Sequence, residues 1–172
     1  MKKNITPTNN EYTLSESEQI ITKTDLHGVL KYCNPKFIEF SGYKESELLG
    51  KPHNIIRHPD MPRVMFHLMW ENLKANREFN GYIKNICRDG SYYWVFANVT
   101  PSMSPTNELL GYYSVRRKPN EEALEYIKNL YIELLEIEKQ HSKEEAIEAS
   151  LYKLHSVLNG REVGYDEFIL TI

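Results

Sequence analysis

The chain has 172 residues, of which 41% are hydrophobic and 26% charged, and this balance is typical of one globular domain with an appendage. A formal net charge of −3 leaves no electrostatic footprint for nucleic acid. The apolar runs are far shorter than the roughly 20 residues of a membrane-spanning helix, and the N-terminus lacks the apolar stretch of a signal peptide, so we expect a cytoplasmic protein without direct membrane insertion.

Turn and cap residues divide the first 50 residues into short elements. Gly28 marks a hairpin turn between two stretches of strand-forming residues. Asn34-Pro35 predicts the start of a helix, because Asn is a good N-cap and Pro suits the first helical position. Glycine at 42 and 50 predicts helix ends. The expected elements are a polar N-terminal cap at 1–18, mobile or in a short helix, strands at 19–23 and 29–33, and helices at 35–41 and 44–49.

Residues 52–62 form a corner that is interrupted by three prolines and carries most of the chain's candidate chemistry. Proline fixes its own φ and pushes the preceding residue out of the helical region. The run therefore predicts a helical turn over 54–57, an extended corner, and a new helix from Pro62. The charged and titratable side chains in it are His53, Arg57, His58 and Asp60. Such a corner suits a polar, phosphorylated ligand; the alternative is a surface loop whose charges pair with each other.

The spacing of apolar residues changes after this corner. Residues 63–75 have the three- and four-residue spacing of an amphipathic helix. Strands follow at 80–88, 91–101 and 109–117, the first two joined by an Asp89-Gly90 hairpin turn. These elements predict an α+β domain over 19–118, with one antiparallel sheet and helices on one face.

Pro119 marks a boundary, and residues 119–172 read as a helical extension. An apolar stripe over 121–139 predicts one helix. Ser142 and Glu145 form a capping box for a second helix that ends at Asn159-Gly160. Residues 167–172 are expected to be a short apolar tail.

Short phrases over residues 24–117 resemble the PAS domain family. They are Asn34-Pro35-Lys36-Phe37, Ser41-Gly42-Tyr43, Glu47-Leu48-Leu49-Gly50, and the turn Arg88-Asp89-Gly90 followed by Trp94. The corner, together with Met69-Trp70, Lys84-Asn85 and Tyr93-Trp94-Val95, is similar to the FAD-binding PAS domain of the aerotaxis receptor. The resemblance implies a PAS fold, that is, a five-stranded antiparallel sheet with helices on one face, here followed by C-terminal helices.

The same resemblance implies FAD as the cofactor of a redox or oxygen sensor. It matches Arg57, His58 and Asp60 to positions associated with FAD binding. Arginine offers a planar fork of donors for a phosphate, while His58 and Asp60 suit sugar hydroxyls, unless Asp60 orients Arg57. Asn85 is expected to pair with the polar edge of the isoalloxazine ring; the alternative is a strand-end hydrogen bond. The remaining candidate cofactor-binding residues are Asn34, His53, Trp70 and Phe79.

Two of these candidates are ambiguous from the sequence. Trp70 has helical spacing with Phe66 and Leu73, so core packing is as good an explanation as cofactor contact. Phe79 stands where the aerotaxis receptor has Trp, which keeps an apolar wall but loses the indole donor.

The side of the sheet on which Trp94 lies depends on the hairpin turn. A two-residue loop pairs Asn85 with Trp94 and places both on the cavity face. A three-residue loop with a glycine bulge shifts the register by one residue and turns Tyr92, Trp94 and Phe96 outward. We favour the bulged turn, which leaves an aromatic outer face that needs a cover.

Three other functions can be weighed against a flavin redox sensor. A haem or small-ligand sensor would use His53, His58 or His67 as axial ligand, and FMN is a further alternative to FAD. A blue-light receptor would need an adduct cysteine near position 53, which is His53. A flavoenzyme would need a substrate pocket or a second cofactor site, and nothing in the sequence supplies either. Cys33 and Cys87 are expected to be reduced packing residues.

The output of such a sensor must leave through a protein surface. The aerotaxis receptor continues into a membrane span, whereas this chain is similar to the stand-alone PAS proteins of bipartite energy-taxis systems. The expected partner is a membrane-bound, methyl-accepting-type chemotaxis transducer in trans, and a homodimer is left open. The expected position is cytoplasmic, or peripheral to the inner membrane through that partner.

Overall fold

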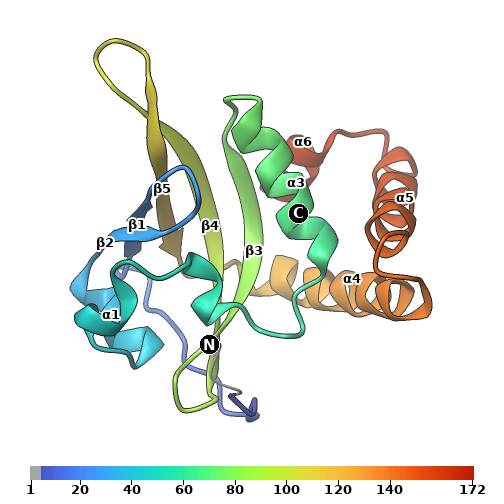
Figure 1. The fold of residues 1–172 in the computed structure, drawn as a ribbon. Coiled ribbons are helices and arrows are strands. Elements are labelled where there is room, and N and C mark those ends of the chain that lie inside the picture. The colour runs from blue at the N-terminus through green and yellow to red at the C-terminus, as the bar shows by residue number, and fades with distance from the viewer. Residues whose placement is uncertain (1–4) are drawn as a thin grey trace.

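The computed structural model describes residues 5–172 and is built around a five-stranded antiparallel sheet with the strand order β2-β1-β5-β4-β3 (Figure 1). Its strands are β1 (Ile20–Thr24), β2 (Leu30–Cys33), β3 (Phe79–Ile86), β4 (Tyr92–Met103) and β5 (Leu109–Arg117). The predicted α+β class is confirmed, and every predicted strand is present with its ends shifted by at most a few residues.

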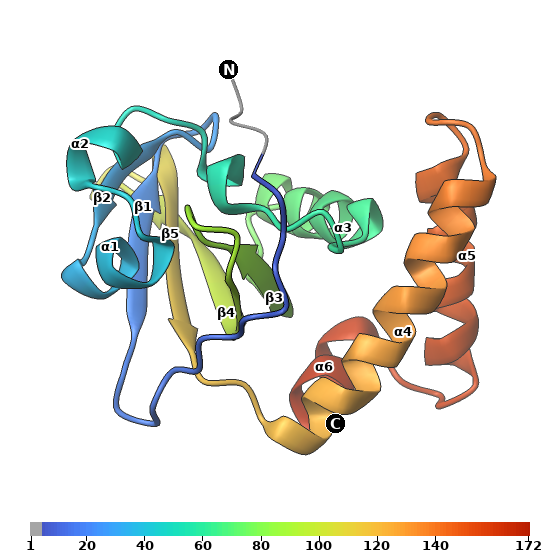
Figure 2. The ribbon, with the colours of Figure 1, turned by 90° about the horizontal axis from the view of Figure 1, so that it is seen from below.

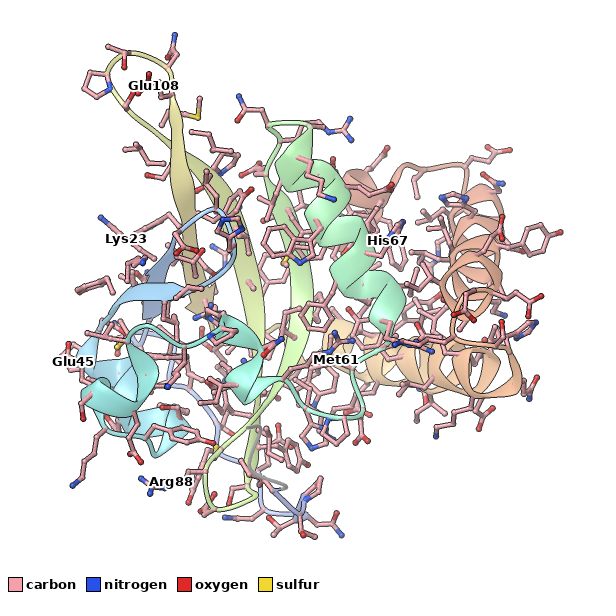
Figure 3. All side chains as sticks on the ribbon, in the orientation of Figure 1. Lys23, Glu45, Met61, His67, Arg88 and Glu108 are labelled. Carbon is pink, nitrogen blue, oxygen red and sulfur yellow. The ribbon has the colours of Figure 1, made fainter. Side chains whose placement is uncertain are left out.

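One face of the sheet, the inner face, is covered by short helices. They are α1 (Pro35–Ser41), α2 (Glu45–Leu48), the 3-10 turn η1 (His53–Ile56) and α3 (Arg63–Lys74). As predicted, Asn34 caps α1, since its side-chain oxygen accepts from the Phe37 amide, and Gly42 ends that helix at φ 71°. In Figure 3, Met61 marks the corner between η1 and α3, and His67 lies on α3.

The turn between β3 and β4 confirms the bulged register. Asn85 pairs with Tyr93 and Lys84 pairs with Trp94. Gly90 has φ 91°, a backbone conformation that a side chain would strain. Because side chains alternate along a strand, Asn85 lies on the inner face and Trp94 on the outer one.

The outer aromatic face is covered by the chain's own C-terminal helices, α4 (Glu121–Gln140), α5 (Ala146–Asn159) and α6 (Tyr165–Thr171). Tyr131 of α4 packs 6.1 Å from Trp94, centroid to centroid, and donates its hydroxyl to the Tyr82 carbonyl at 2.9 Å. Figure 2 shows α4 passing from the sheet toward α5, which lies beside it. The aromatic face is thus buried within one chain.

The segment expected to be a short apolar tail at 167–172 is instead mostly helical, since residues 167–171 belong to α6. Tyr165, at the start of α6, donates to the Asn80 carbonyl at 2.9 Å and stacks on Phe79, with the two rings inclined by 12°. Gly81 leaves room for this hydroxyl, because a Cβ there would lie 3.1 Å from it. Tertiary contacts, which a short segment does not reveal, stabilise this last helix.

The N-terminal segment also differs from the expected short helix. Residues 1–4 of the predicted cap lie outside the described residues, and residues 5–18 form no helix. Instead, the segment runs along the β3–β4 turn. The Thr8 amide donates to the Gly90 carbonyl at 2.8 Å, and Tyr12 and Asn10 exchange backbone bonds with Tyr92. An extended segment can satisfy the backbone groups of Gly90 and Tyr92, whereas a helix would use its own backbone groups internally.

Candidate functional site

A cavity of about 210 Å³, here called the inner cavity, lies between the inner face of the sheet and the helices η1 and α3. Its apolar wall is made largely by Ile56, Phe66, Met69, Trp70, Leu73, Phe79, Ile83, Ala97, Val99 and Tyr112. Trp70 meets the Tyr112 ring edge to face at 5.4 Å between centroids. Trp70 therefore packs against the sheet, as one interpretation of the sequence expected, and it also forms a wall of the cavity; its contact with a cofactor stays a prediction.

Three buried polar side chains project from the inner face of the sheet into this cavity. They are Asn85 on β3 and Ser114 and Arg116 on β5, with 3%, 6% and 4% of their surface exposed. Within the described part of the chain, Asn85 Nδ2, Ser114 Oγ and Arg116 Nη1 have no hydrogen-bond partner. Buried donors are normally satisfied, and each unsatisfied one costs about 1–3 kcal/mol. A ligand that offers hydrogen-bond acceptors in this cavity would satisfy these buried groups.

Arg116 brings a buried positive charge to this cavity. Its Nη2 donates to Thr22 Oγ1 at 2.9 Å and to His53 Nε2 at 2.6 Å. Among residues 5–172, no carboxylate forms an ion pair with it. Burial lowers the pKa of Arg116 to about 10, so the guanidinium remains charged at neutral pH.

His53 is the neutral partner of this arginine. Burial, and then the neighbouring charge of Arg116, lowers the pKa of His53 to about 3. A neutral imidazole can accept at Nε2 while its proton sits on Nδ1. His53 therefore lines the cavity and orients Arg116 from the η1 side, and its contact with a cofactor stays a prediction.

Arg57 stands at the opening of the cavity. Its backbone bridges to that of Asn85, its guanidinium lies 3.9 Å over the Phe66 ring, and its Nη2 donates to the Met61 carbonyl at 3.4 Å. No described carboxylate lies within ion-pair distance of it. The Met61 carbonyl and the Phe66 ring hold this guanidinium in place, and its charge remains available to an anionic ligand.

His58 and Asp60 take up different positions from those expected. The interpretation that Asp60 orients Arg57 is wrong, because Asp60 accepts from Lys84 Nζ at 2.7 Å. His58 is 1% exposed, and its Nδ1 accepts from the Asp60 amide at 3.1 Å. Burial, then Lys84, lowers the pKa of His58 to about 4, although Asp60 opposes the shift. The charges of the corner therefore do not pair with each other: Asp60 pairs with Lys84 on β3, and Arg57 forms no ion pair with a described carboxylate.

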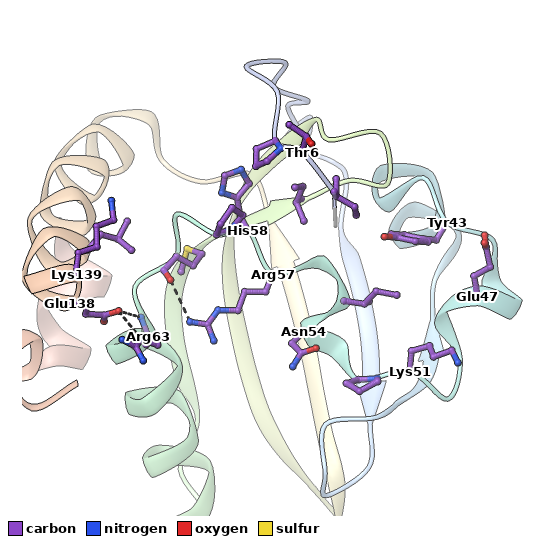
Figure 4. Close-up of a pocket in the computed structure, with 18 of the residues that line it drawn as sticks. Thr6, Tyr43, Glu47, Lys51, Asn54, Arg57, His58, Arg63, Glu138 and Lys139 are labelled. Atoms are coloured by element: carbon purple, nitrogen blue, oxygen red, sulfur yellow. Dashed lines mark hydrogen bonds and ion pairs between the residues drawn. The ribbon is translucent and has the colours of Figure 1, made fainter. Parts of the chain in front are cut away.

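A second, open hollow lies outside the corner and is here called the outer hollow. It encloses about 1300 Å³ between the N-terminal segment, the η1–α3 corner and α4 (Figure 4). Its lining includes Arg57 and His58 from the corner and Glu138 and Lys139 from α4. Pro52, Asn54 and Arg57 line both the inner cavity and the outer hollow, so the two spaces adjoin at Arg57.

The structure thus brings together most of the predicted site residues. The inner cavity is lined by His53, Arg57, Trp70, Phe79 and Asn85, and the outer hollow by Arg57 and His58. Asn34 lines neither: its Oδ1 accepts from Ile21 and Phe37, and its Nδ2 donates to the Gln19 carbonyl. Its amide is fully used in joining α1 to β1, which corrects its assignment to the cofactor site.

Arg116, Ser114 and Thr22 line the inner cavity but were not predicted as site residues from the sequence. The alternation of Tyr112, Ser114 and Arg116 along β5 places all three on one face, and this pattern was available in the sequence. A run of Arg-Arg-Lys at the end of a strand normally predicts exposed side chains, however. Only the folded structure, with β5 in the centre of the sheet, shows that Arg116 lies on the inner face.

The two cysteines behave as packing residues. Cys33 and Cys87 are 3% and 1% exposed and do not line the inner cavity. Burial raises the pKa of Cys33 and raises that of Cys87 to about 12, so both are thiols at neutral pH. Residues 5–172 include no group of three or more potential metal ligands, and no helix among them has the length and hydrophobicity to span a bilayer.

The sheet order, the helices over one face and the enclosed cavity are the architecture of a small α+β sensor domain. The model of the PAS fold matches residues 30–116, and the chain belongs to this family.

Two relatives extend the comparison beyond the fold. The aerotaxis receptor of Escherichia coli (strain K12) is 37% identical over 118 residues, which are 69% of this chain and 23% of the receptor. The nitrogen fixation regulatory protein of Klebsiella pneumoniae is 30% identical over 107 residues, 62% of this chain and 22% of that protein. The chain therefore spans less than a quarter of either relative's length.

A solved light-oxygen-voltage domain, studied with a flavin analogue, has the same fold. It matches with a TM-score of 0.59 and 21% identity, over 68% of this chain and 90% of that one.

Proposed function

We propose that the protein binds FAD without a covalent bond and acts as a redox or oxygen sensor in energy taxis. The observation that carries the proposal is the set of unpartnered buried donors of Asn85, Ser114 and Arg116 in an otherwise apolar cavity. The polar edge of an isoalloxazine ring offers acceptors to such donors, and its fused rings suit flat apolar walls. The similarity to the aerotaxis receptor supports the same ligand class.

Arg116 would be the residue through which this chain favours a reduced flavin. A bound flavin supplies reversible electron uptake. A cation in a low-dielectric site stabilises negative charge placed beside it. Because Arg116 has no carboxylate partner in the described chain, its charge is available for the ring, and His53 and Thr22 hold the guanidinium in place.

The signal would leave through β3. Asn85, on the inner face of this strand, belongs to the same element as Tyr82, whose carbonyl accepts from Tyr131 of α4. A change in hydrogen bonding at Asn85 would reach the C-terminal helices by way of this strand. We infer that residues 19–118 sense and that the helical extension at 119–172 transmits. The chain would signal as a cytoplasmic protein, alone or as a homodimer, to a membrane-bound transducer in trans rather than catalyse a reaction.

The geometry is less suited to haem. The inner cavity, at about 210 Å³, is smaller than the roughly 300–1,000 Å³ of most pockets for whole ligands. His53 Nε2 is occupied by Arg116 and Thr22, while His67 pairs with Glu71 and lines neither the inner cavity nor the outer hollow. His58 lines the outer hollow instead.

The test is to purify the protein, record its visible spectrum and identify the released cofactor by chromatography. Flavin bands in the blue with FAD as the released compound support the proposal, and FMN would correct the cofactor. An intense Soret band, or no flavin uptake by the purified protein, would overturn it. Anaerobic reduction and reoxidation of the bound flavin then tests the sensor role.

A further inference from the structure

We propose that the outer hollow takes the adenosine diphosphate half of the dinucleotide, and that Lys139 of α4 is a phosphate-binding residue across from Arg57. This inference rests on the proposed function and names a contact outside residues 30–116, the part that the PAS fold model matches. It makes the C-terminal extension part of the ligand site.

The inner cavity and the outer hollow differ in volume. The inner cavity holds about 210 Å³, which accommodates a ring system but not a whole dinucleotide, whereas the outer hollow holds about 1300 Å³. The two spaces share Pro52, Asn54 and Arg57 in their walls. A ligand whose ring enters the inner cavity therefore emerges past Arg57 into the outer hollow.

The charged side chains on the walls of the outer hollow suit an anionic ligand. Figure 4 shows the Arg57 side chain extending toward the α4 side of the hollow, where Glu138, Lys139 and Arg63 lie. Arg63 is neutralised by Glu138, with 3.4 Å between Arg63 Nε and the carboxylate. Arg57 and Lys139 form no ion pair with any described carboxylate, although Arg57 donates to the Met61 carbonyl. Asp60 lies near enough to Lys139 that Lys84 and Lys139 together lower the pKa of Asp60 against the effect of burial. Two cations that form no ion pair, on the walls of one hollow, suit a diphosphate.

The end of α4 that carries Lys139 is fixed against α3. Pro62 gives α3 no side-chain cap, and the first amides of that helix donate instead to the Glu138 carboxylate, from Arg63 and Val64 at 2.9 Å each. Ser150 of α5 also donates to Glu138, at 3.3 Å. Glu138 is 5% exposed. This buried carboxylate locks α4 to the helix that follows the corner, and so holds the next residue, Lys139, at the hollow.

Lys51 provides an internal competitor to this assignment. It also lines the outer hollow, but beyond Asn54 on the wall away from α4 (Figure 4). A dinucleotide tail that turned the other way would meet Lys51 instead. The FAD affinities of the Lys139→Gln and Lys51→Gln variants therefore show which wall of the outer hollow the adenosine diphosphate half contacts.

The experiment compares FAD with riboflavin, which lacks the phosphates and the adenosine, by fluorescence titration of the apo-protein. Lys139→Gln should raise the Kd of FAD about three- to five-fold, the range of an exposed ion pair, and leave the Kd of riboflavin unchanged. Lys143→Gln, an exposed lysine in the α4–α5 connection, is the matched control and should change neither. Hydrogen exchange at residues 136–140 should slow with FAD and not with riboflavin.

Several results would overturn the inference. A phosphate contact affects FAD alone, so equal losses of FAD and riboflavin affinity in Lys139→Gln would refute it. An effect of Lys51→Gln on FAD in place of Lys139→Gln would place the tail on the other wall. If the wild-type protein binds riboflavin and FAD equally well, the outer hollow is not used although the flavin proposal stands. If it binds neither, both proposals fail.

Discussion

Replacing Arg116 with Met should make the empty protein more stable and the flavin site worse. Arg116 is 4% exposed and has no carboxylate partner in the described chain. Desolvation of a buried ion costs several kcal/mol, and it is offset by two hydrogen bonds, to Thr22 and His53, of roughly 1.5–3 kcal/mol each. Methionine removes the desolvation cost, fills similar space and leaves the Thr22–His53 hydrogen bond in place. The unpartnered Nη1 of Arg116 adds a cost of about 1–3 kcal/mol that no hydrogen bond offsets, so we expect the free energy of unfolding to rise by about 1–2 kcal/mol when arginine is replaced.

The same change should weaken FAD binding by about 10- to 100-fold, because one charge-assisted contact of roughly 1.5–3 kcal/mol is lost. Urea unfolding of the apo-protein and fluorescence titration with FAD measure the two quantities separately. Arg117→Met is the matched control, since Arg117 is the exposed neighbour on the same strand, and neither quantity should change by much. An apo-protein destabilised by Arg116→Met, together with unchanged FAD affinity, would show that Arg116 is a structural residue.

Four further outcomes are expected. Arg57→Ala should cut the flavin that co-purifies, through loss of a phosphate contact worth roughly 1.5–3 kcal/mol; full occupancy in the absorbance ratio at the flavin and protein bands would remove Arg57 from the site. Glu138→Ala should lower the urea unfolding free energy by about 2–4 kcal/mol, because two helix N-terminal amides and the Arg63 guanidinium lose their acceptor; a change below 1 kcal/mol would mean that water replaces the carboxylate. Replacing Cys33 and Cys87 together with Ala should leave flavin binding and redox cycling intact, and loss of reversible reduction in a folded, loaded variant would reveal a chemical role.

The last outcome is a pH dependence. Burial holds the pKa of His53 at about 3, below the roughly 6.5 of an unfolded histidine, so the unfolded chain takes up a proton first as the pH falls. The unfolding free energy should therefore decrease below pH 6.5, by up to about 1.4 kcal/mol per pH unit from this group, until the pH reaches about 3; His53→Gln should flatten the curve between pH 6.5 and 5, and an unchanged slope would contradict a neutral, buried His53.

The local sequence determined the elements of this protein. Asn34 and Gly42 bound α1, and Gly90 sets a bulged turn that orients Trp94 outward, because caps and turns depend on a few neighbouring residues. The sequence of the corner also indicated Arg57 as a candidate phosphate-binding residue, and only the structure showed that it lies where the inner cavity and the outer hollow adjoin. The helical stripe at 121–139 predicted α4 nearly to the residue.

Only the tertiary structure decided how the site is assembled. Arg116 joins the cavity because β5 lies in the centre of the sheet, and the cation is then enclosed by helices that come from another part of the chain. Glu138 caps a helix that begins 75 residues earlier, which no local pattern can encode. Asp60 pairs with Lys84 rather than Arg57 because the sheet brings that lysine closer. Spacing along the chain fixes backbone conformation, whereas the partner of a charged side chain depends on which elements the fold places beside it.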